Sequence, residues 1–180
     1  DDFRPYHPHF EEIQSLYKEE SPKYTSKFSG RMTEELIDKA VSEKYNIVVE
    51  GTFRTSATPV STLKKMKQAG YRTGIAIQIC DKETSWKSCQ ERYEKMKETN
   101  PLLARAVDKA HHDLVIRQLP ETIKAVYESG FADSLEIYER FPKDGTFAVR
   151  KIFSSEDGKP LDVKMIEDVL EGRADYNKMP

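Results

Sequence analysis

The apolar pattern of this chain switches repeatedly between the period of a helix and the period of a strand, which restricts the folds it can adopt. Helical spacing predicts helices over residues 9–20, 26–43, 59–69, 82–99, 107–119, 120–129 and 160–171. Apolar or alternating runs predict strands over residues 45–49, 73–80, 135–141 and 147–153. Helices and strands that alternate in this way are typical of an α/β fold, with helices flanking a mostly parallel sheet.

The last two predicted strands differ from the others in their connection. They are separated by Pro142-Lys143-Asp144-Gly145, whose residue types favour a tight turn. The two strands are therefore expected to form an antiparallel hairpin at one edge of the sheet. One domain is predicted over residues 1–172, followed by a tail over residues 173–180.

Charge and cysteine content exclude several classes of protein. Charged residues make up 33% of the 180 residues, and the formal net charge of −2 gives no support to general binding of nucleic acid or of anionic membranes. No apolar run has the length of a membrane span. Two well-separated cysteines, Cys80 and Cys89, are typical of a reducing compartment rather than of a disulfide scaffold. A cytoplasmic protein is expected.

The segment that follows the predicted strand over residues 45–49 is the first candidate site. In open α/β sheets, ligands bind beyond the carboxyl ends of the strands. Here that position is occupied by Glu50-Gly51-Thr52-Phe53-Arg54-Thr55. Arg54 could grip a phosphate bidentately, and Gly51 permits close approach of the backbone. A surface ion pair between Glu50 and Arg54 explains the same residues equally well.

Acidic and basic residues elsewhere provide further candidates. Asp1 or Asp2 could take a proton from an acceptor hydroxyl, although a terminal acid pair is usually solvated. Arg92 and Arg105 stand on either side of a helix break at Asn100-Pro101, an arrangement in which a lid presents cations to a transferring phosphoryl group.

The positions of histidines and glycines bear on whether the chain has a metal site or an ATP phosphate loop. His7 and His9 lack partner ligands at metal spacing, and a structural role is expected for His111 and His112. No Gly-x-x-x-x-Gly-Lys-Ser/Thr occurs in the 180 residues. The residues alone therefore indicate an α/β domain with an anion-binding site.

Several separated motifs coincide with one known family. They are Asp1-Asp2-Phe3-Arg4-Pro5-Tyr6-His7-Pro8, Arg31-Met32-Thr33-Glu34, Glu50-Gly51-Thr52-Phe53-Arg54-Thr55, Glu91-Arg92-Tyr93 and Ala104-Arg105-Ala106. Their order resembles that of the zeta toxins, and His112-Asp113 and Leu119-Pro120 continue the likeness. The resemblance covers roughly residues 1–140, and its strength lies in the number of motifs rather than in any single one.

The resemblance implies a fold and an activity. Zeta toxins are P-loop kinases of bacterial toxin–antitoxin modules, which transfer the γ-phosphate of ATP to the 3′-hydroxyl of the amino sugar in UDP-N-acetylglucosamine. By this resemblance Asp1 is the general base, and Arg92 and Arg105 engage the ATP phosphates. The sugar nucleotide is held at Glu34, Glu50, Thr52, Arg54 and Thr62. ATP and Mg²⁺ are the implied cofactors, and a protein antitoxin is the implied partner.

One departure from the family pattern limits what is expected of the chain itself. In the family, the first strand and the ATP phosphate loop precede the segment that corresponds to Asp1–Pro8, and the 180 residues contain no such loop. The chain as given is therefore expected to lack kinase activity. Two alternatives remain open: a phosphotransferase for another sugar nucleotide or hydroxyl acceptor, and a non-catalytic fragment that binds an antitoxin.

Overall fold

A computed structural model describes residues 3–101 and 103–174, which divide into two compact units. The helical unit comprises residues 1–50 and 87–108, and the sheet unit comprises residues 51–86 and 109–180. The chain passes from one unit to the other after Glu50, after Trp86 and after Asp108, and the second of these points lies within helix α4 (Lys82–Thr99).

The helical unit begins with short helices and continues into a long one. These are η1 (Arg4–Tyr6), α1 (Phe10–Tyr17), η2 (Lys18–Glu20) and α2 (Ser21–Ser42). Pro22 occupies the first turn of α2, where backbone N–H groups have no acceptor within the helix, so the absence of an N–H on proline costs no hydrogen bond. Small polar residues on α2, among them Thr25 and Ser29, are buried, so neighbouring backbone can approach this helix closely.

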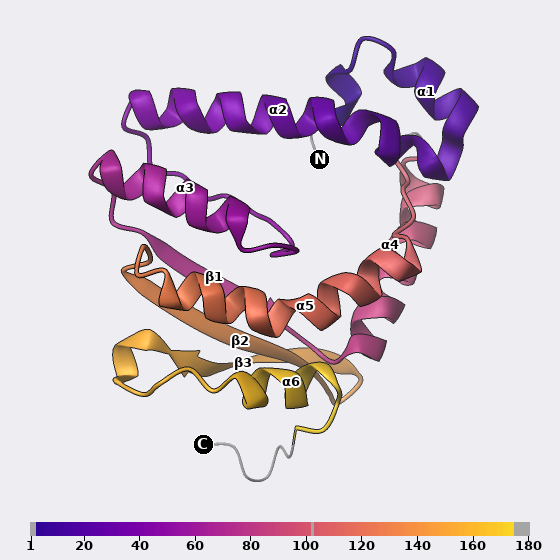
Figure 1. Ribbon diagram of the computed structural model, residues 1–180. Helices are drawn as coiled ribbons and strands as arrows, with labels where there is room; N and C mark the ends of the chain where they lie inside the picture. Colours follow the sequence, from indigo (N-terminus) through magenta and orange to yellow (C-terminus); the bar gives the residue numbers. More distant parts are fainter. Residues whose placement is uncertain (1–2, 102, 175–180) are drawn as a thin grey trace. The chain divides into compact units, whose positions relative to one another are not determined.

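The sheet unit is built on three strands in the order β1-β2-β3 (Figure 1). Strand β1 (Gly74–Ile79) runs parallel to β2 (Ser134–Lys143), and β2 pairs antiparallel with β3 (Thr146–Ser154). The β2–β3 turn uses positive φ angles at Asp144 and Gly145, as type I′ hairpins require. The predicted C-terminal hairpin and the mixed α/β fold are thus confirmed.

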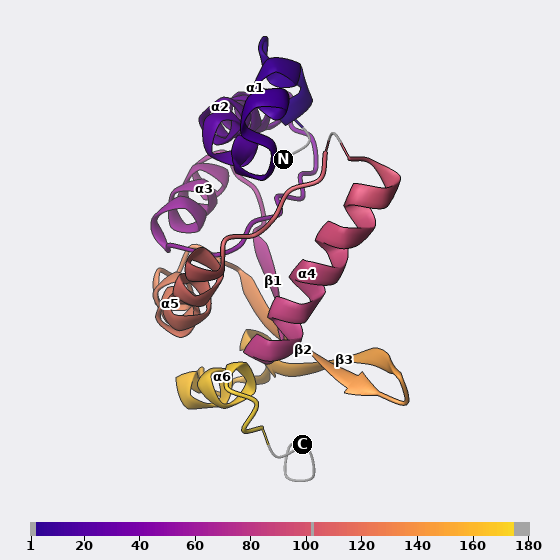
Figure 2. The same ribbon diagram turned by 90° about the vertical axis from the view of Figure 1, so that its right-hand side faces the viewer.

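Helices of the sheet unit cover the apolar face of the sheet. They are α3 (Ala57–Gln68), α5 (Lys109–Glu128) and α6 (Val163–Leu170), and a short helix η3 (Ser155–Asp157) follows β3. Helices α5 and α6 lie on the same side of the strands (Figure 2). The core that they form with the sheet includes Ile77, Ile123, Ile137 and Ile166, of which the last three are fully buried.

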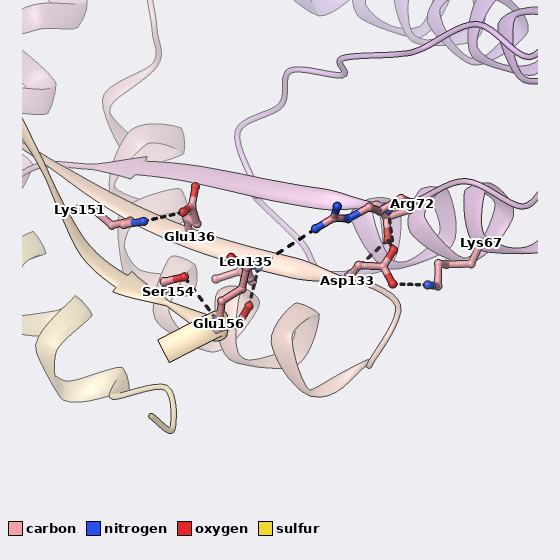
Figure 3. Close-up of polar contacts among 10 residues, drawn as sticks. Lys67, Arg72, Asp133, Leu135, Glu136, Lys151, Ser154 and Glu156 are labelled. Atoms are coloured by element: carbon pink, nitrogen blue, oxygen red, sulfur yellow. Dashed lines mark hydrogen bonds and ion pairs between the residues drawn. The ribbon is translucent and has the colours of Figure 1, made fainter. Parts of the chain in front are cut away.

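The amino ends of the two parallel strands are joined by a polar cluster around Asp133 (Figure 3). Lys67 of α3 donates to this carboxylate at 2.5 Å, and the Thr73 backbone N–H donates to it at 2.7 Å. These contacts, that of Lys67 foremost, lower the pKa of Asp133 to about 2. The cluster therefore ties α3 to the entry of both strands.

The prediction of a strand over residues 45–49 is wrong. This segment forms neither helix nor strand, and Val48 is 92% exposed. A strand exists through the hydrogen bonds that it makes with a neighbour, and within the described residues the sheet contains β1, β2 and β3 alone. Residues 45–49 therefore have the composition of a strand but lack the hydrogen-bonded pairing with a neighbour that defines one.

Two predicted helix boundaries also differ. Residues 107–119 and 120–129 were expected as separate helices, but α5 continues through Pro120, whose side chain is buried beside Leu119. The apolar contacts of this stretch with the core therefore outweigh the cost of about 3 kcal/mol that an internal proline imposes. Helix α3 begins at Ala57, so Pro59 lies within its first turn rather than at its first position.

Candidate functional site

The loop of residues 51–56 in the sheet unit holds two of the predicted ligand contacts. Phe53 has a φ of 53° and packs against the hydrophobic core, while Thr52 and Arg54 on either side of it are exposed. A positive φ at a residue with a bulky side chain costs on the order of 1–2 kcal/mol. The partly buried phenyl ring packs on the core, which offsets this strain, and its two polar neighbours are exposed. The loop is thus held in a defined conformation.

Helix α3 follows this loop and carries the third predicted contact of the sheet unit. Thr62 is half-buried and stands next to Leu63, which is part of the core. Its backbone is therefore fixed by the packing of α3 on the sheet.

The predicted contacts in the helical unit lie on the surface. Glu50 is exposed at the end of the extended segment, and Glu34 is exposed on α2. The spacing of Glu34, three residues before Ile37 and seven before Val41, predicts that it lies on the apolar stripe of its helix, where a ligand or an internal lysine or arginine could satisfy it. This prediction is wrong. The buried residue of this stretch is Ile37, and Glu34 points to solvent with Leu36, which is 54% exposed.

A cavity of about 360 Å³ in the helical unit brings two arginines together. Its lining consists of Arg4, Pro5, Phe10, Gln14, Ser21, Pro22, Thr25, Met96, Leu103, Ala104 and Arg105. Among these described residues there is no carboxylate, so the two guanidiniums are the charged groups of the lining and suit an anionic ligand. Its remaining polar side chains are the Ser21 and Thr25 hydroxyls and the Gln14 amide, and those of Ser21 and Gln14 can donate to the oxygens of such a ligand.

Arg4 is locked in place at the wall of this cavity. Its Nη1 donates to the Pro22 carbonyl at 2.9 Å and to the Thr25 hydroxyl at 2.8 Å. Thr25 is 1% exposed and in turn donates to the Ser21 carbonyl at 3.2 Å. Burial lowers the pKa of the Arg4 guanidinium, which nevertheless stays a cation at neutral pH.

The far end of α4 is tied to the other helices of this unit. The Tyr93 hydroxyl donates to the Glu19 carboxylate, a contact that raises the pKa of Tyr93 to about 12. This hydrogen bond joins α4 to η2, next to the turn of α4 that supplies Met96 to the cavity. Arg92 lies one residue before Tyr93 on the exposed side of the helix and is outside the cavity lining.

The predicted site residues are therefore divided between the two units. Glu34, Glu50, Arg92 and Arg105 belong to the helical unit. Thr52, Arg54 and Thr62 belong to the sheet unit. Asp1 lies outside the described residues. That all of them surround one ligand stays a prediction.

Sequence reasoning did not single out Arg4 as a candidate, although the motif that contains it was recognised. An arginine that lines a cavity cannot be told from a surface arginine by composition or spacing. The signal that could have found it was its position within Asp1–Pro8, the segment that resembles the family motif. The structural role expected for His112 is confirmed, because its imidazole is 7% exposed and both ring nitrogens have partners.

The described part of the chain lacks two further features. It contains no group of three or more histidines, cysteines, aspartates or glutamates that could hold a metal ion. No helix within it has the length and apolar character needed to span a bilayer. Cys80 and Cys89 are both free thiols that are partly buried.

Comparison with known proteins identifies relatives along most of the chain. The family model of the zeta toxins matches residues 1–150. Toxin PezT of Streptococcus pneumoniae is 37% identical over 140 residues, which are 78% of this chain and 55% of that protein. Toxin zeta of Streptococcus pyogenes is 34% identical over 140 residues, which are 78% of this chain and 49% of that protein. The chain thus spans about half the length of these relatives.

A solved structure agrees with the sequence comparisons. It comes from a characterisation of the PezAT chromosomal toxin–antitoxin system of Streptococcus pneumoniae. The similarity has a TM-score of 0.78 at 28% identity, and covers 99% of this chain and 67% of the other. Motifs, family model, relatives and fold agree, and the chain belongs to the zeta toxin family.

Proposed function

We propose that this chain is the acceptor-binding and arginine-bearing part of a kinase that phosphorylates UDP-N-acetylglucosamine at the 3′-hydroxyl of its amino sugar. The complete protein would act as the toxin of a toxin–antitoxin system. The observation that carries this proposal furthest is the cavity in the helical unit. It combines Arg4 and Arg105 with two hydroxyls, and its described lining contains no carboxylate.

Arginines suit the donor side of such a reaction. A transferring phosphoryl group accumulates negative charge on its oxygens, and preorganised cations stabilise it more than they stabilise the bound substrate. Arg105 would supply one such cation from the cavity. Arg92, exposed on α4, would supply a second. Mg²⁺ would be held largely by the phosphates of ATP, because it is usually bound through one or two carboxylates together with substrate phosphates.

The loop of residues 51–56 suits the acceptor side. A guanidinium binds phosphate oxygens bidentately, and the Thr52 hydroxyl can both donate to and accept from a sugar or diphosphate. Since the Phe53 ring anchors the loop, little backbone conformational entropy would be lost when Arg54 and Thr52 bind. Thr62 and the acids Glu34 and Glu50 would complete this side, and Asp1 would take the proton of the attacking hydroxyl.

A binding experiment tests the acceptor side directly. Calorimetric titration of this chain with UDP-N-acetylglucosamine should give saturable binding, and Arg54→Ala should weaken it about 10–100-fold, as expected for one charge-assisted bidentate contact. Arg72→Ala is the matched control, because that side chain is 82% exposed and pairs with Glu156 on the same unit. The control should bind like the parent.

The alternatives give different outcomes in the same titration. Equal binding of UDP-N-acetylglucosamine and UDP-glucose would contradict the assigned acceptor and favour a kinase for other sugar nucleotides. Binding of a cognate antitoxin without binding of any sugar nucleotide would favour a non-catalytic interaction module. Asp1→Ala, made in a polypeptide that includes an ATP phosphate loop, should abolish turnover, and an active variant would rule out Asp1 as the base.

The partner is proposed on the same grounds. A relative with this fold comes from a toxin–antitoxin system, and we expect this chain to bind a protein antitoxin. Co-purification of the toxin with the product of the adjacent gene, followed by light scattering, would test it. A monodisperse complex is expected, and separate elution of the two proteins would contradict the assignment.

A further inference from the structure

The chain leaves and re-enters the sheet unit at two points that are flanked by one cluster of side chains. The chain leaves the sheet unit after Trp86 and returns to it at Lys109. The intervening residues 87–108 carry both Arg92 and Arg105. Five residues of the sheet unit flank these two connections and contact one another; we call them the clasp, and they are Ser85, Trp86, Lys109, His112 and Asp113.

A chain of hydrogen bonds runs through the clasp. His112 Nε2 lies 3.0 Å from Ser85 Oγ, and His112 Nδ1 lies 3.2 Å from Asp113 Oδ1. An ionised carboxylate can only accept, so Nδ1 carries a proton and donates to Asp113. In the neutral imidazole, Nε2 then accepts from the Ser85 hydroxyl. The ring therefore links the first turn of α4 to the first turn of α5.

Aromatic and ionic contacts join the remaining members of the clasp. The Trp86 ring meets the His112 ring edge-on, with centroids 5.4 Å apart. Lys109 Nζ lies 5.2 Å from the centroid of the Trp86 ring, and Lys109 also pairs with Asp113. The pKa of Asp113 is lowered by Lys109 and, to a smaller degree, by His112. Ser85 and Trp86 thus contact His112 or Lys109 across the two connections, and Asp113 supports both of these partners from its own side.

We propose that the clasp is a positioning device, which fixes the ends of the 87–108 segment relative to each other and so restricts the motion of its two arginines. Holding the ends of a segment together removes most of the conformations that its residues could otherwise adopt. Directional hydrogen bonds also set the orientation of the two helix starts, which an apolar contact of the same size would leave free. The catalytic consequence of this restriction rests on the proposed kinase function, whereas the restriction itself does not.

Hydrogen exchange measured by mass spectrometry tests the restriction without any activity assay. Ser85→Ala removes one hydroxyl from the clasp, and peptides from residues 87–108 should exchange about 5–10-fold faster, the factor expected for loss of one net hydrogen bond. Peptides from β2 and β3 should be unchanged. Ser85→Thr keeps the hydroxyl and should restore slow exchange.

A matched control separates the clasp from general loosening of the fold. Ser129→Ala removes a hydroxyl that donates to the Val126 carbonyl in the last turn of α5, the helix that carries His112. It should leave residues 87–108 unaffected. Asp113→Ala removes the acceptor of the His112 Nδ1–H group and should act like Ser85→Ala. Unchanged exchange of residues 87–108 in both clasp variants, or equally faster exchange in the β2–β3 hairpin, would overturn the proposal.

Kinetics test the functional consequence separately. In a polypeptide that includes an ATP phosphate loop, Ser85→Ala should lower kcat about 10-fold and leave the KM for UDP-N-acetylglucosamine unchanged, because it loosens the arginines and not the acceptor loop. Faster exchange with unchanged kcat would show a clasp without a catalytic role. Absence of turnover in the parent would count against the proposed function, and the exchange experiment would still decide whether the clasp exists.

Discussion

Removal of one arginine from β3 should destabilise the sheet unit far more than removal of a surface arginine. Glu139 on β2 is 1% exposed and lies opposite Arg150 on β3. Its Oε2 accepts from Arg150 Nε at 2.9 Å and lies 2.8 Å from Nη2. Arg150→Leu would leave this carboxylate buried without its cation. Loss of one partner from a buried ion pair costs about 3–5 kcal/mol.

The assay is equilibrium unfolding in urea, followed by circular dichroism. With a slope of about 2 kcal/mol per M for a chain of this size, the midpoint of Arg150→Leu should fall by roughly 2 M. The double variant Glu139→Leu/Arg150→Leu removes both charges, and should lie within about 1 kcal/mol of the parent or above it. Arg72→Leu, the exposed control, should change the free energy of unfolding by less than about 0.5 kcal/mol.

Two results would refute this reasoning. Arg150→Leu could unfold at the same midpoint as Arg72→Leu, which would mean that Glu139 reaches water or another partner. Alternatively, the double variant could be as unstable as Arg150→Leu, which would assign the loss to packing of the arginine on Phe141, whose ring centroid lies 5.1 Å from the guanidinium carbon. Either outcome would remove the buried pair as the reason for the stability of the hairpin.

Three further predictions concern contacts and packing elsewhere in the chain. Contact with Lys67 and its neighbours holds the pKa of Asp133 near 2, below the usual value of a carboxyl, so its contribution to stability is complete above about pH 4 and is lost as the pH falls through about 2. Asp133→Asn should therefore flatten this part of a plot of Tm against pH. An unchanged plot would contradict the assignment. Glu19→Gln should return the pKa of Tyr93 from about 12 toward 10 in an ultraviolet titration, unless another acid holds the hydroxyl. Ile137→Ala, at a fully buried position in the central strand, should cost about 2–5 kcal/mol in urea unfolding, and a loss below 1 kcal/mol would mean that the core collapses around the cavity.

Elements with strong local signals could be predicted from the sequence. The helix over residues 82–99 was predicted with the bounds that α4 has, because Asp81 caps its start by accepting from the Thr84 N–H at 2.8 Å and Asn100-Pro101 ends it. The β2–β3 hairpin followed from Asp144-Gly145, where two consecutive positive φ angles are needed. Both signals act within a few residues of the chain.

Features that depend on distant partners could not be predicted in this way. Residues 45–49 have the composition of a buried strand, but strand formation requires a neighbour that no local pattern supplies. Glu34 was placed on an apolar stripe from its spacing to Ile37, although a spacing of three residues is also compatible with opposite edges of one helix face. The clasp around His112 joins residues far apart in sequence, so the sequence indicated a structural histidine without its partners.

The identity of the phosphorylated product decides whether the proposed kinase activity is correct. The most direct measurement is incubation of the full-length protein with ATP, Mg²⁺ and UDP-N-acetylglucosamine, followed by mass spectrometry and ³¹P NMR of the sugar nucleotide. One added phosphoryl group is expected on the 3′-oxygen of the amino sugar, and Arg105→Ala should lower the rate by a factor on the order of 10²–10³. Recovery of unmodified UDP-N-acetylglucosamine, while another acceptor is phosphorylated, would contradict it.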